Sequence, residues 1–369
     1  MRIGIMTMHR VQNVGSVLQA YALQNKIEQF GHDVEIIDYV FPPPKERHFT
    51  PKDVISWGWD AMQGFPARRK AKKMARFRND FLHTSSIEYS THEELISSPP
   101  KYDIYCTGSD QVWNPKHVGY DTSFMLDFAP KNAPRISYAS SFATAEIEEP
   151  FFSLYAQFLE KYDSLTVREQ SGINIINKMT GKNAQVVCDP TLLLTKTEWD
   201  TVANQTEVGL SKGYILIYLL RYMFDPRPGF YNIVESVRQA LNLPVYQFNP
   251  YSNDGFHKHI IPLRGMGPMD FVSLVKNASF IVTDSFHGAA FATIYNIPMI
   301  GIVKDASDAE GRIATLRKNV GGENSIIQFD QTHSFDFNSS DFYKCDSLKY
   351  LSFMQNSTDV LRDMIERIR

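Results

Sequence analysis

The segment from Phe280 to Tyr295 limits the possible folds more than any other part of the chain. An apolar run, Phe280–Thr283, leads into a short polar turn, and a helical pattern rich in small residues follows at Gly288–Tyr295. A buried strand that passes directly into a helix is typical of parallel α/β sheets. His287 stands where the strand would end and the helix begin, and ligands of such sheets bind at that edge. An anion would also be favoured there by the helix amino terminus.

The same alternation of strand and helix occurs in both halves of the chain. The strand-forming runs of the first half are Ile3–Met6, Val34–Ile37, Asp103–Cys106, Ile136–Tyr138, Ser164–Val167 and Gln185–Cys188. Those of the second half are Tyr214–Leu220, Val245–Phe248, His259–Ile261, Phe280–Thr283 and Pro298–Val303. The predicted fold class is therefore α/β, with two doubly wound domains that face a cleft.

A polar segment at residues 203–211 separates the two sets of strands. We place the domain boundary there, which gives an N-terminal domain of residues 1–205 and a C-terminal domain of residues 206–369. A chain of 369 residues is long for one core and suits two. The last helix, predicted over Tyr350–Arg369, could pack back on the first domain.

An excursion at residues 42–100 interrupts the first domain. It opens on consecutive prolines and contains a basic helical stretch, Arg68–Arg78. Such a stretch is usually the solvated face of a helix. The alternative is a surface that meets an anionic glycan or a lipid-diphosphate carrier, with at most peripheral contact to a membrane.

Composition excludes several classes of protein. A formal net charge of −3 argues against a general nucleic-acid binder. Three widely spaced cysteines, Cys106, Cys188 and Cys345, form neither a zinc motif nor a disulfide framework, and no metal site is predicted. No apolar run approaches the roughly 18 residues that span a bilayer. We expect a cytoplasmic protein, with at most peripheral contact at the inner face of the membrane, and the oligomeric state stays open.

His287 is the first candidate for catalysis. Histidine titrates near neutral pH, so it can accept and donate a proton in one reaction cycle. Asp284 and Ser285 share its turn, where they either cap the helix or contact a ligand. Gly288 would permit the close approach of a ligand or of a neighbouring backbone.

The first strand of the chain is followed by Asn13-Val14-Gly15-Ser16. This segment lies at the place in the first domain that His287 occupies in the second. It lacks the glycine spacing of a dinucleotide-binding loop, but Asn13, Gly15 and Ser16 could cradle a polar ligand on backbone N–H groups.

A second polar turn follows the strand Asp103–Cys106. Ser109, Asp110 and Gln111 offer hydroxyl, carboxylate and amide groups of the kind that bind sugar hydroxyls. Asp110 would accept a hydrogen bond or serve as a base. Trp113 is either a platform for a sugar ring or an anchor for the loop.

Two arginines are candidates for binding an anionic ligand. Arginine grips carboxylate and phosphate groups with two parallel hydrogen bonds. Arg168 follows a predicted strand, although an ion pair with Glu169 would explain it equally well. Arg312 lies on the expected cleft side of the second domain.

Six motifs together resemble the polysaccharide pyruvyl transferase family. They are Asn13-x-Gly15-Ser16-x-Leu18-Gln19-Ala20, Thr107-Gly108-Ser109-Asp110-Gln111-Val112-Trp113-Asn114-Pro115, Tyr138-Ala139-Ser140-Ser141-Phe142, Val167-Arg168-Glu169, Asp189-Pro190-Thr191-Leu192 and Thr283-Asp284-Ser285-Phe286-His287-Gly288. The resemblance implies two Rossmann-like domains similar to those of the GT-B glycosyltransferases. It also implies transfer of a pyruvyl group from phosphoenolpyruvate to a sugar of a cell-surface polysaccharide or a lipid-linked precursor, with no cofactor.

The resemblance, combined with the motifs, gives each candidate a role. Catalysis is assigned to His287 and Asp110. Donor binding is assigned to Arg168, Asp284, Ser285, Gly288 and Arg312. Acceptor binding is assigned to Asn13, Gly15, Ser16, Ser109, Gln111 and Trp113.

The chain departs from the family pattern at one position. Well-studied members have Arg-x-His at the turn where this chain has Ser285-Phe286-His287. Arg312 is the candidate to supply the missing cation. Two alternatives stay open, namely a GT-B glycosyltransferase that uses a nucleotide sugar and a glycan-binding protein without turnover.

Overall fold

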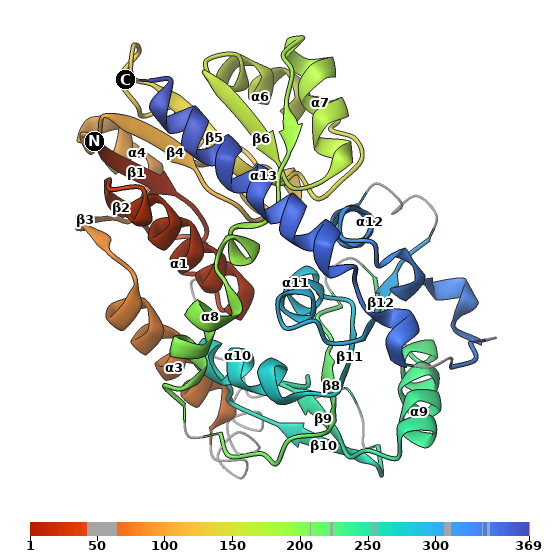
Figure 1. Cartoon of the computed structure of the whole chain (residues 1–369). Coiled ribbons are helices and arrows are strands. Elements are labelled where there is room, and N and C mark those ends of the chain that lie inside the picture. The colour runs from red at the N-terminus through yellow and green to blue at the C-terminus, as the bar shows by residue number, and fades with distance from the viewer. Residues whose placement is uncertain are drawn as a thin grey trace, which may run out of the picture.

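The computed structural model describes residues 1–42, 65–206, 208–221, 224–251, 254, 257–305, 311–333, 335–337 and 340–368. Two parallel sheets, each flanked by helices, dominate these residues (Figure 1). The predicted α/β class with two doubly wound sheets is confirmed. Of the excursion predicted at 42–100, residues 43–64 lie outside the described part of the chain.

The first sheet has seven parallel strands. Their order across the sheet is β3 (Thr84–Tyr89), β2 (Asp33–Tyr39), β1 (Arg2–Met6), β4 (Ile104–Thr107), β5 (Arg135–Ser140), β6 (Ser164–Val167) and β7 (Gln185–Val186). The second sheet has six parallel strands. Their order is β10 (Ile260–Leu263), β9 (Val245–Phe248), β8 (Ile215–Tyr218), β11 (Phe280–Thr283), β12 (Met299–Val303) and β13 (Ile326–Gln328).

Both sheets reverse their strand order at the same topological place. The reversal lies between β1 and β4 in the first sheet and between β8 and β11 in the second. Crevices form at such switch points, because the connections leave the two strands in opposite directions. The segments that follow β1, β4, β8 and β11 are therefore where a ligand is expected.

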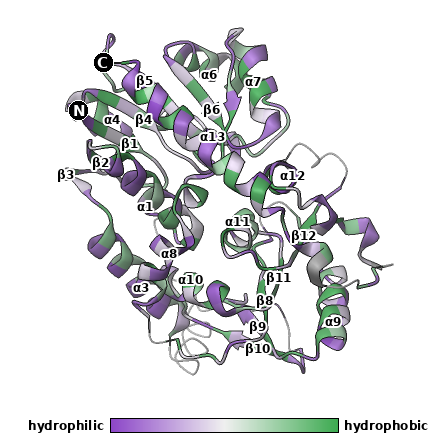
Figure 2. Cartoon of the chain, viewed as in Figure 1, coloured by the Kyte–Doolittle hydropathy of each residue, from purple (hydrophilic) through white to green (hydrophobic). Residues whose placement is uncertain are grey.

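The helices connect and cover these strands. They are α1 (Val14–Gln29), α3 (Pro66–Phe81), α4 (His92–Ser97), α5 (Pro115–Val118), α6 (Phe151–Leu159), α7 (Gln170–Thr180), α8 (Lys196–Ala203), α9 (Gly229–Leu241), α10 (Pro268–Asn277), α11 (Phe286–Ile294), α12 (Arg312–Asn319) and α13 (Ser347–Glu366). Figure 2 shows hydrophobic residues along the strands and hydrophilic residues on the outer helices such as α3. None of the helices in the described part of the chain combines the length and apolar character that crossing a bilayer requires.

One apolar core continues from one sheet to the other. It includes Ile5 on β1, Leu216 on β8 and Phe291 on α11, all without exposed surface. The long helix α13 joins the same core through Leu361 and contacts the segment that follows β7, where the backbone N–H of Cys188 donates to its Ser357 hydroxyl at 2.9 Å. Figure 1 shows α13 running alongside both halves. The two halves are thus held together by shared packing.

Two strands were missed by the sequence analysis, and both are edge strands. β3 falls inside the excursion at 42–100 and exposes most of its side chains, so it lacks an apolar signal. β13 is only three residues long. The basic stretch forms α3, whose Met74 and Phe77 are buried while Arg68, Arg69 and Lys72 lie on the outside. Its Lys73 pairs with the buried Asp270 of α10 at 2.6 Å, which ties α3 to the second half.

Candidate active site

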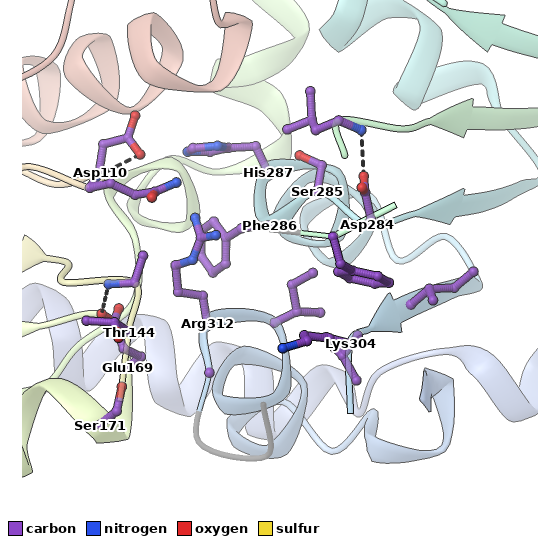
Figure 3. Close-up of a pocket in the computed structure, with 18 of the residues that line it drawn as sticks. Asp110, Thr144, Glu169, Ser171, Asp284, Ser285, Phe286, His287, Lys304 and Arg312 are labelled. Carbon is purple, nitrogen blue, oxygen red and sulfur yellow. Dashed lines mark hydrogen bonds between the residues drawn. The ribbon is translucent and has the colours of Figure 1, made fainter. Parts of the chain in front are cut away.

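A cavity of about 290 Å³ lies between the two halves. Its walls come from segments that follow β1, β4, β5 and β6 of the first sheet and β8, β11 and β12 of the second. Figure 3 shows Asp110 pointing toward His287 across it, with Arg312 below. The volume is near the lower end of the range for small-molecule sites, about 300 Å³. Both switch points therefore meet at one small cavity.

Four helix amino termini converge on this cavity. The N-cap residues of α1, α7, α11 and α12 all line it, and they are Asn13, Glu169, Ser285 and Gly311. Asn13 accepts the N–H of Gly15, and Ser285 accepts the N–H of Gly288. The remaining N–H groups of each first turn give a helix amino terminus a partial positive charge. The cavity is therefore suited to an anion.

His287 lies in the first turn of α11 and is 4% exposed. Burial lowers the pKa of its imidazole, while the carboxylates of Asp189 and Asp110 oppose that shift and Arg168 reinforces it. Its Nε2 lies 3.9 Å from Oδ2 of Asp189 and has no hydrogen-bond partner among the described residues. A mostly neutral imidazole at this place can accept a proton.

Asp110 is buried beside the histidine. Its Oδ2 accepts from the Ser16 hydroxyl and its Oδ1 accepts from the backbone N–H of Gln111. Burial raises the pKa of Asp110, but the charge of Arg168, together with the hydrogen bond from Ser16, favours the carboxylate, and the pKa lies below its usual range. Asp110 is thus a carboxylate in a cavity wall, and Ser16 supports it rather than facing a ligand.

Arg168 does not lie where a donor-binding arginine was expected. It is 2% exposed and pairs with Asp189 at 2.9 Å and with Asp110 at 3.6 Å. Its guanidinium also stacks on the ring of Phe286, 4.3 Å from the ring centre. A buried charge needs such partners. The expectation of a direct donor contact is therefore corrected, and so is the alternative of an ion pair with Glu169.

Two of the predicted acceptor residues lie in the protein interior. Trp113 has no exposed surface, and its indole N–H donates to the carbonyl oxygen of Phe124 at 3.2 Å. It is the anchor of its loop, and its ring cannot serve as a platform for a sugar. Ser109 is equally buried and contacts Ala139 and Asp189. Both predictions are corrected, because the Trp113 ring packs on Phe142 in the apolar interior and the Ser109 hydroxyl is turned toward Asp189.

The turn before His287 holds the backbone in place. Asp284 accepts the N–H groups of Leu220 and Arg221 at 2.6 and 2.7 Å, which fixes the segment after β8. Burial raises the pKa of Asp284 to about 6, although these hydrogen bonds act in the opposite direction. A methyl group at Gly288 would lie 2.5 Å from Oγ1 of Thr283, so this glycine serves close packing.

Of the remaining predicted residues, Gly15 is buried against the ring of His287 and does not line the cavity, whereas three others do. Asn13, Gln111 and Arg312 all form part of its wall, and Arg312 lies near enough to act on the pKa of Asp110. In Figure 3 the guanidinium of Arg312 extends toward His287 and Asp110 from the first turn of α12.

Three residues with apparent roles were not assigned by the sequence analysis. Lys304 follows β12 and lines the cavity as a second cation. Glu169 also lines it, and its Oε1 accepts three donors from residues 141–143. Asp189 is fully buried beside His287. The sequence contained an indication for Glu169 and Asp189, since both occur in motifs of the resemblance, but none for Lys304.

No group of acidic, histidine or cysteine side chains in the described ranges could hold a metal ion.

A family model described as polysaccharide pyruvyl transferase matches residues 13–305. The chain belongs to the polysaccharide pyruvyl transferase family. The six motifs from Asn13 to Gly288 all lie within the matched range, so the resemblance that they indicated is confirmed. The family is one of transferases, which makes the chain an enzyme of that class. No curated protein matches the chain.

Solved structures share the fold of this family member. The UDP-GlcNAc 2-epimerase from Methanocaldococcus jannaschii has a TM-score of 0.56 and 13% identity, over 99% of this chain and 100% of that chain. The UDP-GlcNAc 2-epimerase from Neisseria meningitidis bound to UDP-GlcNAc has a TM-score of 0.57 and 8% identity, over 100% of each chain. At these identities the likeness concerns the fold alone, and it confirms the predicted GT-B-like architecture.

Proposed function

We propose that this pyruvyl transferase family member moves a pyruvyl group from phosphoenolpyruvate to two hydroxyls of one sugar. The acceptor is a sugar of a cell-surface polysaccharide or of its lipid-linked precursor. The observation that carries the proposal is the position of His287 at a cavity lined by four helix amino termini and two cations, Arg312 and Lys304. Phosphoenolpyruvate carries a phosphate and a carboxylate, which match these groups.

The chemistry balances with the groups present. A proton adds to the methylene carbon of phosphoenolpyruvate, and a sugar hydroxyl attacks the central carbon. The bond to phosphate then breaks, and a second hydroxyl of the same sugar closes the ketal. The two hydroxyl protons end on the new methyl group and on the departing phosphate. His287, with Asp110 beside it, is the group in the cavity suited to move them.

The acceptor side is assigned to the wall from the first half. Asn13 and Gln111 offer amide groups there, and the Gln111 side chain is held by hydrogen bonds from Asn114 at 2.8 Å and with His117 at 3.1 Å. Fixed amides are suited to binding sugar hydroxyls, because the ordering cost has already been met in the free protein.

The test is release of phosphate from phosphoenolpyruvate in the presence of a panel of galactosides and mannosides. We expect acceptor-dependent release, reduced about 100-fold or more by His287→Ala, the usual scale for a lost general acid or base. His83→Ala is the matched control, because His83 is an exposed histidine paired with Glu28 outside the cavity wall. An unchanged rate in His287→Ala would reject the catalytic role.

Two other outcomes would support different functions. Calorimetric binding of a nucleotide sugar, without binding of phosphoenolpyruvate, would favour a GT-B glycosyltransferase. The presence of Ser285 in place of the family arginine is the feature that favours this alternative. Binding of a glycan that His287→Ala leaves intact, with no turnover, would favour a glycan-binding protein.

A further inference from the structure

One nitrogen of the His287 imidazole makes no hydrogen bond in the described part of the chain. Nε2 is buried and has no hydrogen-bond partner among the described residues. The carboxylate oxygen Oδ2 of Asp189 lies 3.9 Å away. That separation is about 1 Å longer than an N–H···O hydrogen bond. Catalytic hydrogen bonds are often long in free enzymes and shorten when substrate binds.

Asp189 is held rigidly by the first half of the molecule. Its Oδ1 accepts the N–H and the hydroxyl of Thr191 at 3.0 and 2.7 Å. Its Oδ2 accepts Nη1 of Arg168 at 2.9 Å. The side chain has no exposed surface. A carboxylate fixed in this way can orient a side chain from the opposite half that forms a hydrogen bond with it.

One acceptor position on Asp189 can be vacated. The hydroxyl of Ser109 lies 2.8 Å from Oδ2 of Asp189 and also 2.8 Å from the carbonyl oxygen of Ala139. A hydroxyl has a single proton and can donate to only one of these acceptors at a time. When Ser109 donates to Ala139, Oδ2 of Asp189 is left with a lone pair for the imidazole N–H.

We propose that Asp189 is the positioning residue of His287, and that substrate binding shortens their 3.9 Å separation by about 1 Å, which joins them through Nε2–H···Oδ2. This inference rests on the transfer reaction proposed above. The bond fixes the ring orientation and the tautomer, and it leaves Nδ1 to exchange a proton with the substrate. Arg168 and Ser109 then act as supports for Asp189, which explains why both are buried.

Three other charged groups act on the imidazole. Asp110 lies on the first half and raises the pKa of His287, whereas Arg168 and Arg312 lower it. Without the Asp189 charge, Asp110 would be the one carboxylate of the described residues left to raise the pKa of His287. The two arginines that lower this pKa would then have the larger effect. The pKa of His287 therefore falls in Asp189→Asn, and this direction holds whether His287 acts as acid or as base.

The first test is the pH profile of kcat/KM for phosphate release by Asp189→Asn. We expect a loss in kcat/KM of about 10- to 100-fold, the scale for residues that orient a functional group. We also expect the limb of the pH profile that follows the pKa of His287 to shift to lower pH. Thr191→Val is the matched control. It removes one hydrogen bond to Asp189 but keeps the carboxylate, so its limb stays in place. An unchanged limb in Asp189→Asn overturns the inference.

The second test reads the imidazole directly and needs no turnover. Nitrogen NMR of protein labelled in histidine, with His287→Gln for assignment, reports the tautomer of His287 with and without phosphoenolpyruvate. We expect Nε2–H in the wild-type protein with phosphoenolpyruvate bound. The Nδ1–H tautomer under that condition overturns the inference even if Asp189→Asn fails to fold.

The two tests also separate this inference from the proposed function. If phosphate release depends on acceptor while Asp189→Asn leaves the limb and the tautomer unchanged, only the role of Asp189 fails. If no phosphate is released but bound phosphoenolpyruvate still gives the Nε2–H tautomer in the wild-type protein and the Nδ1–H tautomer in Asp189→Asn, the pairing stands and the proposed transfer reaction fails.

Discussion

A methyl group added at Gly15 would lie 2.1 Å from Nδ1 of His287, so the first turn of α1 packs directly against the catalytic candidate. Gly15 belongs to the first half and His287 to the second. The absence of a side chain at position 15 is therefore a condition for the histidine to lie where it does. This contact joins the two switch points into one site.

Gly15→Ala should displace His287. We expect a loss of phosphate release of at least about 10-fold, because a shift of about 1 Å in a catalytic group already has effects of this size or larger. The free energy of unfolding should also fall, by about 1–3 kcal/mol, since the added methyl group overpacks the contact. Steady-state kinetics and urea denaturation provide the measurements.

A double mutant separates steric overlap from other effects of alanine at position 15. Removal of the imidazole in His287→Ala opens the space that the methyl group needs. In that background Gly15→Ala should cost much less stability than in the wild-type protein. Equal destabilisation in both backgrounds would mean that the contact is not the cause.

The acidic limb of kcat/KM should lie below pH 6.5. Burial lowers the pKa of His287 in the free protein, so the imidazole stays neutral to lower pH than an exposed histidine. A base is active when it is neutral, and activity is therefore lost only as pH falls through that lowered pKa. A limb above pH 6.5 would show that another group, or the protonated imidazole, controls the rate.

Arg312→Ala should weaken donor binding more than catalysis. Loss of a charge-assisted contact to phosphate or carboxylate raises the KM for phosphoenolpyruvate by about 10- to 100-fold, with a smaller effect on kcat. Arg312→Lys should restore only part of the affinity, because lysine cannot form two parallel hydrogen bonds. Arg76→Ala, at an arginine of α3 paired with Asp80, is the control. A donor KM that does not change in Arg312→Ala would place the cation elsewhere.

Glu169 should matter mainly for the loop that it holds. Its Oε1 accepts the Ser141 hydroxyl and the N–H groups of Phe142 and Ala143 at 2.9 to 3.1 Å. Glu169→Ala leaves these three donors, two of them buried and one half-buried, without a partner and should cost about 3 kcal/mol or more. Glu169→Gln keeps one carbonyl oxygen for them and should cost clearly less. Urea denaturation of the two variants measures the free energy of unfolding. Equal losses of this free energy in both variants would contradict the role of Glu169 in holding the loop.

The sequence was sufficient for the parts of the site that follow strong strand signals. The apolar run before His287 and the run before Asp110 predicted two switch-point turns, and both side chains line the cavity. Trp113 was ambiguous, because an aromatic residue in a polar turn has the same pattern whether its ring points inward or outward. The edge strands β3 and β13 were missed, since an edge strand needs little apolar surface.

The sequence alone determined two parallel sheets, a family and a histidine at the end of a strand, because these depend on local hydrophobic periodicity and on motifs that are contiguous in the chain. The tertiary structure decided which charges neighbour that histidine. Asp189 and Arg168 pair with each other 21 positions apart, and Gly15 meets His287 from the opposite half. Such contacts depend on how two separately wound sheets pack, which no local pattern records.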